Sequence, residues 1–219
     1  MFSTVIFDVD GTLLDTERIY MKAWRQAGEL FGYYIPDEAL KQTRAVSSQI
    51  AIRTFCKFCG EDFPYREIQK ERVRIAEEMI GASTSEQLHK PDVLRVLNDF
   101  IKAGYRLAVA SSTGSEKTVE HLRRAGLLDR FPVVVGGDMV EQGKPEPDIF
   151  LKAAQMSGSA PETCVVIGDT PADVFAGTAA GMKVILIPDQ VPASEQTTAL
   201  SSMILSGLNE LTVDLLNRI

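Results

Sequence analysis

Cysteine, histidine and tryptophan are all scarce in this chain of 219 residues, which contains three, two and one of them. Cys56 and Cys59 have the C-x-x-C spacing of a redox pair or of half a zinc site. A zinc site takes about four ligands, and His89 and His121 are not spaced as a partner pair. We therefore expect no disulfide framework, and we interpret the two cysteines as core residues of a helix in a reducing, cytoplasmic location.

Long apolar runs and an excess of basic charge are also absent. No apolar stretch approaches the roughly 20 residues that cross a bilayer, and Asp8 interrupts the first apolar segment where a secretory signal would continue. We therefore expect no membrane association. The formal net charge of −7 argues against nucleic acid as a partner, because nucleic-acid-binding faces are basic. Small anionic substrates are still compatible with it, because a bound cation can reverse the local field.

Apolar runs rich in β-branched residues alternate with stretches of helical periodicity. Such runs are typical of strands that are buried on both faces of a parallel sheet. Five segments have this character: Ser3–Val9, Tyr105–Ser111, Phe131–Gly137, Thr163–Asp169 and Met182–Pro188. Helical periodicity occurs in Ser115–Ala125, Pro147–Met156, Pro171–Ala180 and Asn209–Asn217. The alternation predicts an α/β fold with a doubly wound, Rossmann-like core built on a parallel sheet.

One connection is too long for a single crossover helix. No segment between Thr16 and Gly104 predicts a strand, whereas loops in α/β units usually have about 2–6 residues. Helical periodicity recurs there in Glu17–Phe31, Asp37–Leu40, Ser48–Cys59, Tyr65–Ile80 and Pro91–Ala103. We interpret the last of these helices as the crossover, and the small, polar segment Gly81–Gln87 as a linker.

These assignments define two domains. We predict that residues 1–15 and 84–219 form the α/β core domain, and that residues 16–83 form an inserted α-helical cap domain. The chain would then enter the cap directly after its first strand.

Two aspartates end the first apolar run, in the segment VIFDVDGT. Asp8 and Asp10 would lie on the same side of an extended strand, and Gly11 allows the backbone to approach a ligand closely. In open parallel sheets, ligands bind beyond the carboxyl ends of the strands. An EF-hand does not fit, because its loop would need an acid or Asn at Thr12 and glycine at Leu13. The alternative to an ordinary turn is a divalent-metal or phosphoryl-transfer site.

Other predicted strand ends carry similar chemistry. Asp169 ends the fourth run and Asp173 follows four positions later, a spacing at which two like charges repel on a helix. A divalent cation would turn this repulsion into attraction, although Asp173 could instead serve only the helix dipole. Ser111 ends the second run, and Lys144 precedes a predicted helix. A purely structural role would leave the repulsion between the acids uncompensated.

Four motifs stand in a fixed order along the chain: DVDGT, AVASS, GKPEP and GDTPAD. With them the chain resembles the haloacid dehalogenase superfamily, and within it the helical-capped phosphatases and the β-phosphoglucomutase-like subfamily. The resemblance covers nearly the whole length. It implies a Mg²⁺-dependent phosphatase that hydrolyses a small phosphomonoester, such as a sugar phosphate, through an aspartyl-phosphate intermediate. A monomer is the expected state.

The resemblance also implies roles for particular residues. Asp8 would be the nucleophile and Asp10 the general acid and base, and Lys144 would hold both Asp8 and the phosphoryl group. The implied metal ligands are Asp8, Asp10 (through its backbone carbonyl), Asp169 and, through water or hydrogen bonds, Asp173. The implied phosphate-binding residues are Gly11, Ser111, Ser112 and Lys144. The cap would contribute Thr16, Glu17 and Arg44 to substrate binding, although Arg44 could equally be a surface arginine.

Two other functions are weighed against hydrolysis. A β-phosphoglucomutase has a histidine where this chain has Tyr20, an arginine where it has Ser48, and an acid where it has Gly168. These departures remove groups that would rebind a bisphosphate, and they favour hydrolysis. A response-regulator receiver also combines acids, a hydroxyl and a lysine on a parallel sheet, but receivers have no inserted cap.

Overall fold

The computed structural model describes residues 2–43 and 48–219. The chain forms two compact units, and each is described by itself. The core unit comprises Met1–Asp15 and Thr84–Ile219, and the inserted unit comprises Thr16–Ser83.

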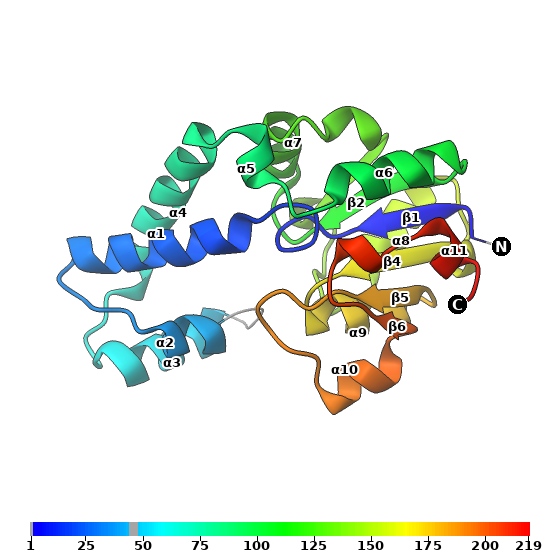
Figure 1. The fold of residues 1–219 in the computed structure, drawn as a ribbon. Coiled ribbons are helices and arrows are strands. Elements are labelled where there is room, and N and C mark those ends of the chain that lie inside the picture. The colour runs from blue at the N-terminus through cyan, green and yellow to red at the C-terminus, as the bar shows by residue number, and fades with distance from the viewer. Residues whose placement is uncertain (1, 44–47) are drawn as a thin grey trace. The chain divides into compact units, whose positions relative to one another are not determined.

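The core unit contains a parallel sheet of six strands in the order β3-β2-β1-β4-β5-β6. The strands are β1 (Thr4–Phe7), β2 (Arg106–Ser111), β3 (Val133–Gly136), β4 (Cys164–Gly168), β5 (Lys183–Leu186) and β6 (Met203–Ile204). β1 is central, because Phe7 pairs with Val109 of β2 on one side and with Ile167 of β4 on the other (Figure 1). The predicted fold class, a doubly wound α/β core with an α-helical insertion, is confirmed.

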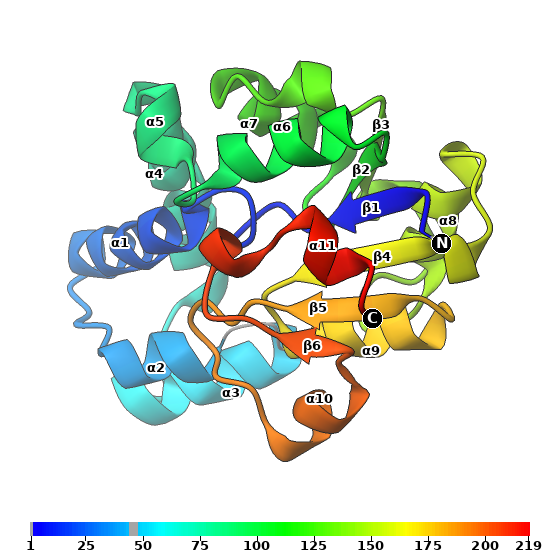
Figure 2. The same ribbon diagram turned by 45° about the vertical axis from the view of Figure 1, so that its right-hand side comes forward.

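Helices cover both faces of this sheet. The crossover helices are α6 (Val93–Lys102), α7 (Ser115–Arg124), α8 (Asp148–Met156) and α9 (Pro171–Ala179). Because side chains alternate along a strand, Ile6 packs in the cluster with Phe150 of α8, whereas Phe7 points to the other face. There the ring centroid of Phe7 lies 6.3 Å from that of Phe100 of α6. Figure 2 shows α8 and α9 on one side of the strands and α6 on the other.

The C-terminal region departs from the predictions. Two elements were not predicted: α10 (Glu195–Leu200) and the two-residue strand β6, which is too short to produce a periodic pattern. The continuous helix expected over Asn209–Asn217 is wrong, because a 3₁₀ turn ends at Glu210 and α11 (Val213–Leu216) begins anew. The break occurs where Leu211 is fully buried in an extended conformation and the Thr212 side chain caps α11.

The inserted unit is entirely helical over its described residues. Its helices are α1 (Thr16–Leu30), α2 (Asp37–Gln42), α3 (Ser48–Cys59) and α4 (Tyr65–Ala82). An aromatic cluster joins three of them. The ring centroid of Trp24 on α1 lies 4.6 Å from that of Phe55 on α3 and 5.7 Å from that of Tyr65 on α4. No helix in the described part of the chain is long and apolar enough to span a membrane.

The two core segments that flank the inserted unit pair with each other. The Asp15 N–H donates to the Leu88 carbonyl at 2.9 Å, and Leu14 forms an antiparallel bridge with His89. The boundary between the two units, at Ser83 and Thr84, lies within the predicted linker Gly81–Gln87, although much of that segment is helical, because α4 continues to Ala82 and α5 (Ser85–Leu88) begins after two residues. Thr84 starts α5 through reciprocal capping hydrogen bonds with Gln87. The chain therefore leaves and re-enters the core unit at neighbouring points.

Candidate active site

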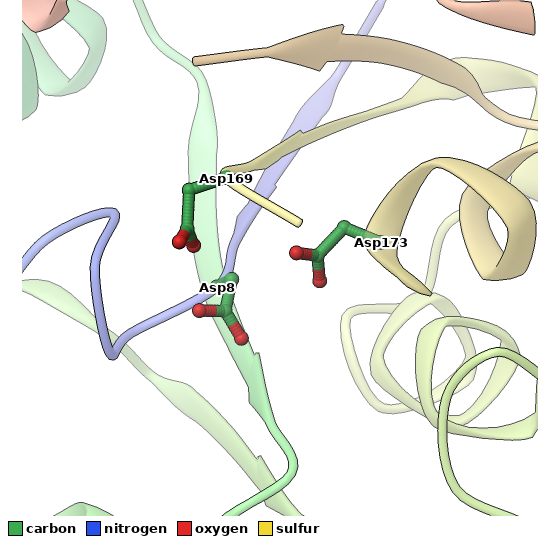
Figure 3. A group of neighbouring side chains, drawn as sticks. All are labelled: Asp8, Asp169 and Asp173. Atoms are coloured by element: carbon green, nitrogen blue, oxygen red, sulfur yellow. The ribbon is translucent and has the colours of Figure 1, made fainter. Parts of the chain in front are cut away.

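Three aspartates meet at the carboxyl ends of β1 and β4. Asp8 follows β1 and donates its backbone N–H to the Ile167 carbonyl of β4 at 2.8 Å. Asp169 follows β4, and Asp173 lies in the first turn of α9. Carboxylate oxygens of Asp8, Asp169 and Asp173 all lie within 4.8 Å of one another, and all three residues are buried. Figure 3 shows the carboxyl groups of Asp169 and Asp173 directed toward Asp8.

Lys144 inserts its ammonium group into this cluster. Its Nζ lies 2.6 Å from Oδ1 of Asp8 and 2.6 Å from Oδ1 of Asp173. Nζ also donates a 2.8 Å hydrogen bond to the Ala110 carbonyl of β2. The Lys144 side chain is only 3% exposed, so a loop residue that the sequence would ordinarily place in solvent is fixed in the interior.

The cluster contains more negative charge than Lys144 neutralises. Burial alone would lower the pKa of Lys144, but the carboxylates of Asp173 and Asp8 hold that pKa above its usual range. Burial raises the pKa of Asp8 to about 8, against the opposing effect of the Lys144 ammonium. Three buried carboxylates beside one ammonium favour an additional cation, and oxygen ligands of this kind suit a hard divalent ion.

Gly11 shapes the turn that passes over Asp169. Its φ of +93° lies in the left-handed region that favours glycine. A Cβ at this position would lie 2.4 Å from Oδ2 of Asp169, well inside contact distance. The next residue, Thr12, donates from Oγ1 to Oδ1 of Asp169 at 2.9 Å. Thr12 was not predicted as a site residue, although it lies inside the DVDGT motif.

Asp173 uses its two carboxylate oxygens differently. Oδ2 accepts hydrogen bonds from the Thr170 backbone N–H at 3.0 Å and from its hydroxyl at 2.6 Å, which caps α9. Oδ1 faces Lys144. Asp173 therefore caps the start of α9 with one oxygen and belongs to the acidic cluster with the other. Gly168 allows this approach, because a Cβ there would lie 2.5 Å from the Asp173 Cβ.

Three hydroxyl residues stand at and just beyond the end of β2, and one of them, Thr113, contacts Asp10. Ser111 is buried and its Oγ accepts the Thr113 backbone N–H at 3.1 Å, whereas Ser112 is exposed. The Thr113 hydroxyl donates to Oδ2 of Asp10 at 2.9 Å. The carboxylate of Asp10 is not part of the group of three aspartates. Thr113 was not predicted as a site residue, and its only signal was its place after the two serines of AVASS.

The other predicted site residues belong to the inserted unit. Thr16 is buried and Glu17 is half-buried at the start of α1, while Arg44 lies outside the described residues. Their roles in substrate binding stay predictions. Cys56 and Cys59 are free thiols on α3 and only half-buried, which differs from the core positions expected for them. Among the described residues, the three aspartates form the only group suited to a metal by its carboxylate, thiol or imidazole ligands.

The fold and the site together define an α/β protein with a carboxylate–lysine cluster beyond adjacent parallel strands and a helical insertion after the first strand. Residues 5–187 match the haloacid dehalogenase-like hydrolase family, and the chain belongs to this family, in its β-phosphoglucomutase-like branch.

Similar proteins include both phosphatases and a mutase. Hexitol phosphatase A of Escherichia coli is 32% identical over 95% of this chain and 92% of its own. β-Phosphoglucomutase of Bacillus subtilis is 27% identical over 97% of this chain and 93% of its own. The crystal structure of CbbY from Rhodobacter sphaeroides with phosphate superposes with a TM-score of 0.81 at 26% identity, covering 99% of this chain and all of that chain. The predicted family is therefore confirmed.

Proposed function

We propose that this protein is a Mg²⁺-dependent phosphatase that hydrolyses a small phosphomonoester, with sugar phosphates as its first candidate substrates. The observation that carries this proposal is the pairing of the buried Asp8 carboxylate with Lys144 at a strand end. A carboxylate that attacks a phosphate dianion needs nearby positive charge to offset repulsion, and Lys144 supplies one such charge. The names of the relatives, among them hexitol phosphatase A and a phosphorylated carbohydrates phosphatase, support a sugar phosphate.

The reaction would proceed in two displacements at phosphorus. An oxygen of Asp8 attacks the phosphorus atom, the bond from phosphorus to the ester oxygen breaks, and Asp10 gives its proton to the leaving oxygen. Asp10 then takes a proton from water, whose oxygen attacks the phosphorus of the aspartyl-phosphate. This step releases inorganic phosphate and restores the Asp8 carboxylate. Throughout, Lys144 and the Ser111 hydroxyl would stabilise charge on the phosphoryl oxygens, whereas the Gly11 N–H already donates to the Leu14 carbonyl at 2.8 Å.

The carboxylates of Asp8 and Asp169 and the backbone carbonyl of Asp10 would hold Mg²⁺, with Asp173 supporting it through water or hydrogen bonds. The ion would supply charge neutralisation for the incoming phosphate. The donor set supports this assignment, because all of its side-chain groups are hard carboxylate oxygens whose mutual repulsion Lys144 offsets only in part.

The close packing of Gly168 against Asp173 favours hydrolysis over the mutase reaction. The mutase pattern has an acid where this chain has Gly168. Here even a Cβ would lie 2.5 Å from the Asp173 Cβ, so an acid does not fit without rearrangement. Tyr20 and Ser48 depart from the same pattern in the inserted unit.

The test is phosphate release from a panel of esters with and without Mg²⁺. The panel contains β-glucose 1-phosphate, hexose and hexitol phosphates, phosphoglycolate and nucleoside monophosphates. We expect Mg²⁺-dependent release from at least one sugar phosphate, and its loss in Asp8→Asn. Glu162→Gln, which neutralises an exposed carboxylate before β4, is the matched control and should behave as wild type. Release that persists in Asp8→Asn would contradict the proposal. Conversion of β-glucose 1-phosphate to the 6-phosphate only after priming with the bisphosphate would favour the mutase.

A further inference from the structure

Thr113 reaches Asp10 from a different strand. Asp10 follows β1, and Thr113 lies two residues beyond the end of β2, 103 positions later in the chain. Its Oγ1 donates to Oδ2 of Asp10 at 2.9 Å, a normal length for such a bond. The proposed function gives Asp10 a proton-transfer role but gives no role to Thr113.

The backbone of Thr113 is held from both sides. Its N–H donates to Oγ of Ser111 at 3.1 Å, and its carbonyl accepts from the Gly137 N–H at 3.0 Å and from Oγ1 of Thr118 at 3.3 Å. Threonine is also β-branched, which restricts its χ1 rotation. The hydroxyl is therefore presented to Asp10 from a fixed position.

The loop after β3 completes this support. Gly137 packs so closely that a Cβ there would lie 2.6 Å from the Ser112 carbonyl oxygen. Asp138 accepts the Ser115 N–H at 2.6 Å and its hydroxyl at 2.9 Å, which fixes the start of α7. The ends of β2 and β3 and the start of α7 therefore hold Thr113 in one conformation.

We infer that Thr113 is a positioning residue that orients the Asp10 carboxyl for proton transfer to and from the reacting oxygens, an inference that rests on the proposed function. A general acid or base acts only within hydrogen-bond reach of the proton that it moves, so its orientation sets its efficiency. A hydroxyl can donate to the ionised carboxylate and accept from the protonated acid. Thr113 can therefore partner Asp10 before and after each proton transfer, while Asp10 alone gives and takes the proton.

The test compares Thr113→Val, which keeps the branched shape and removes the hydroxyl, with Thr113→Ser, which keeps the hydroxyl. Each variant and the wild type are loaded with Mg²⁺ and assayed for kcat/KM on two substrates, the best sugar phosphate and p-nitrophenyl phosphate. The sugar alkoxide needs a proton to leave, whereas the nitrophenolate leaves without one. We expect Thr113→Val to lose roughly 10- to 100-fold on the sugar phosphate and less than about 3-fold on p-nitrophenyl phosphate. Thr113→Ser should stay close to wild type on both.

The two esters separate positioning from a merely structural role. Equal losses on both substrates in Thr113→Val, or full activity on both, would overturn the inference. So would Thr113→Ser falling as far as Thr113→Val on the sugar phosphate. Thermal unfolding of each variant checks that the fold is retained. A wild type that releases phosphate from no ester would refute the proposed function itself, and that result is read before any variant is compared.

Discussion

Thr12 donates a 2.9 Å hydrogen bond from Oγ1 to Oδ1 of Asp169, although 157 positions separate the two residues. Both side chains are buried. Thr12 belongs to the turn after β1 and Asp169 follows β4, so this bond fixes one carboxylate of the cluster relative to the strand that carries Asp8. Partners that orient metal ligands in this way commonly affect metal affinity.

Replacing Thr12 with valine should weaken Mg²⁺ binding. The substitution removes the donor to Asp169 but keeps the shape of the side chain, and we expect a loss of affinity of roughly 10-fold. Titration calorimetry with Mg²⁺ measures this directly, without substrate. Thr12→Ser keeps the hydroxyl and should bind Mg²⁺ about as wild type does. Unchanged affinity in Thr12→Val would show that the bond to Asp169 does not organise the metal site.

Gly11→Ala should destabilise the protein more than Gly104→Ala. The two glycines have similar φ values, +93° and +86°, but a Cβ meets Asp169 at position 11 and nothing within 4 Å at position 104. We expect Gly104→Ala to cost about 1 kcal/mol for its backbone conformation, and Gly11→Ala to cost at least about 1 kcal/mol more for overpacking. Denaturant unfolding of both variants without metal gives the comparison. Equal costs would mean that Asp169 moves aside freely.

Lys144→Met should lower the free energy of unfolding substantially in the absence of metal. The substitution leaves the buried carboxylates of Asp8 and Asp173 facing each other without their shared ammonium. Breaking a buried ion pair in this way typically costs about 3–5 kcal/mol. Lys183→Met, at an exposed position that starts β5, is the control and should change stability by less than about 0.5 kcal/mol. A wild-type denaturation midpoint in Lys144→Met would contradict the charge balance described for this site.

Asp169→Asn should have the opposite effect on the metal-free protein. It removes one negative charge from the cluster, while the Asn carbonyl can still accept from Thr12. We expect stability to rise by on the order of 1 kcal/mol, because one of the mutually repelling carboxylates is neutralised. Mg²⁺ should stabilise the wild type in thermal unfolding and leave this variant unshifted, because one of the proposed carboxylate ligands is lost. Similar Mg²⁺-induced shifts in both proteins would place the ion elsewhere.

Much of the core could be predicted because buried parallel strands and crossover helices leave strong periodic patterns. The runs around Phe7, Val109 and Ile167 became the three central strands. Among the elements that were missed or wrong, β6 and the helix around Leu211 are short and depend on tertiary packing instead of local periodicity.

The candidate site was only partly readable from the sequence, for a related reason. Acids at strand ends are visible as motifs, so Asp8 and Asp169 could be chosen before their side chains were seen to converge. Hydroxyl partners such as Thr12 and Thr113 carry a weaker signal, which is only their place inside or just after a motif. Each acts across more than 100 positions of the chain, and threonine is common in turns of every kind.

The pairing of Asp15 with Leu88 has a consequence for engineering. The core unit flanks the inserted residues 16–83 with two segments that are hydrogen-bonded to each other, through Asp15 and Leu88. The inserted unit therefore has neighbouring attachment points on the core unit. Insertions succeed where the host has to supply only two neighbouring attachment points. We expect a helical insertion from a related chain, or a short closing peptide, to be accepted between these points with the register of β1 against β2 and β4 unchanged.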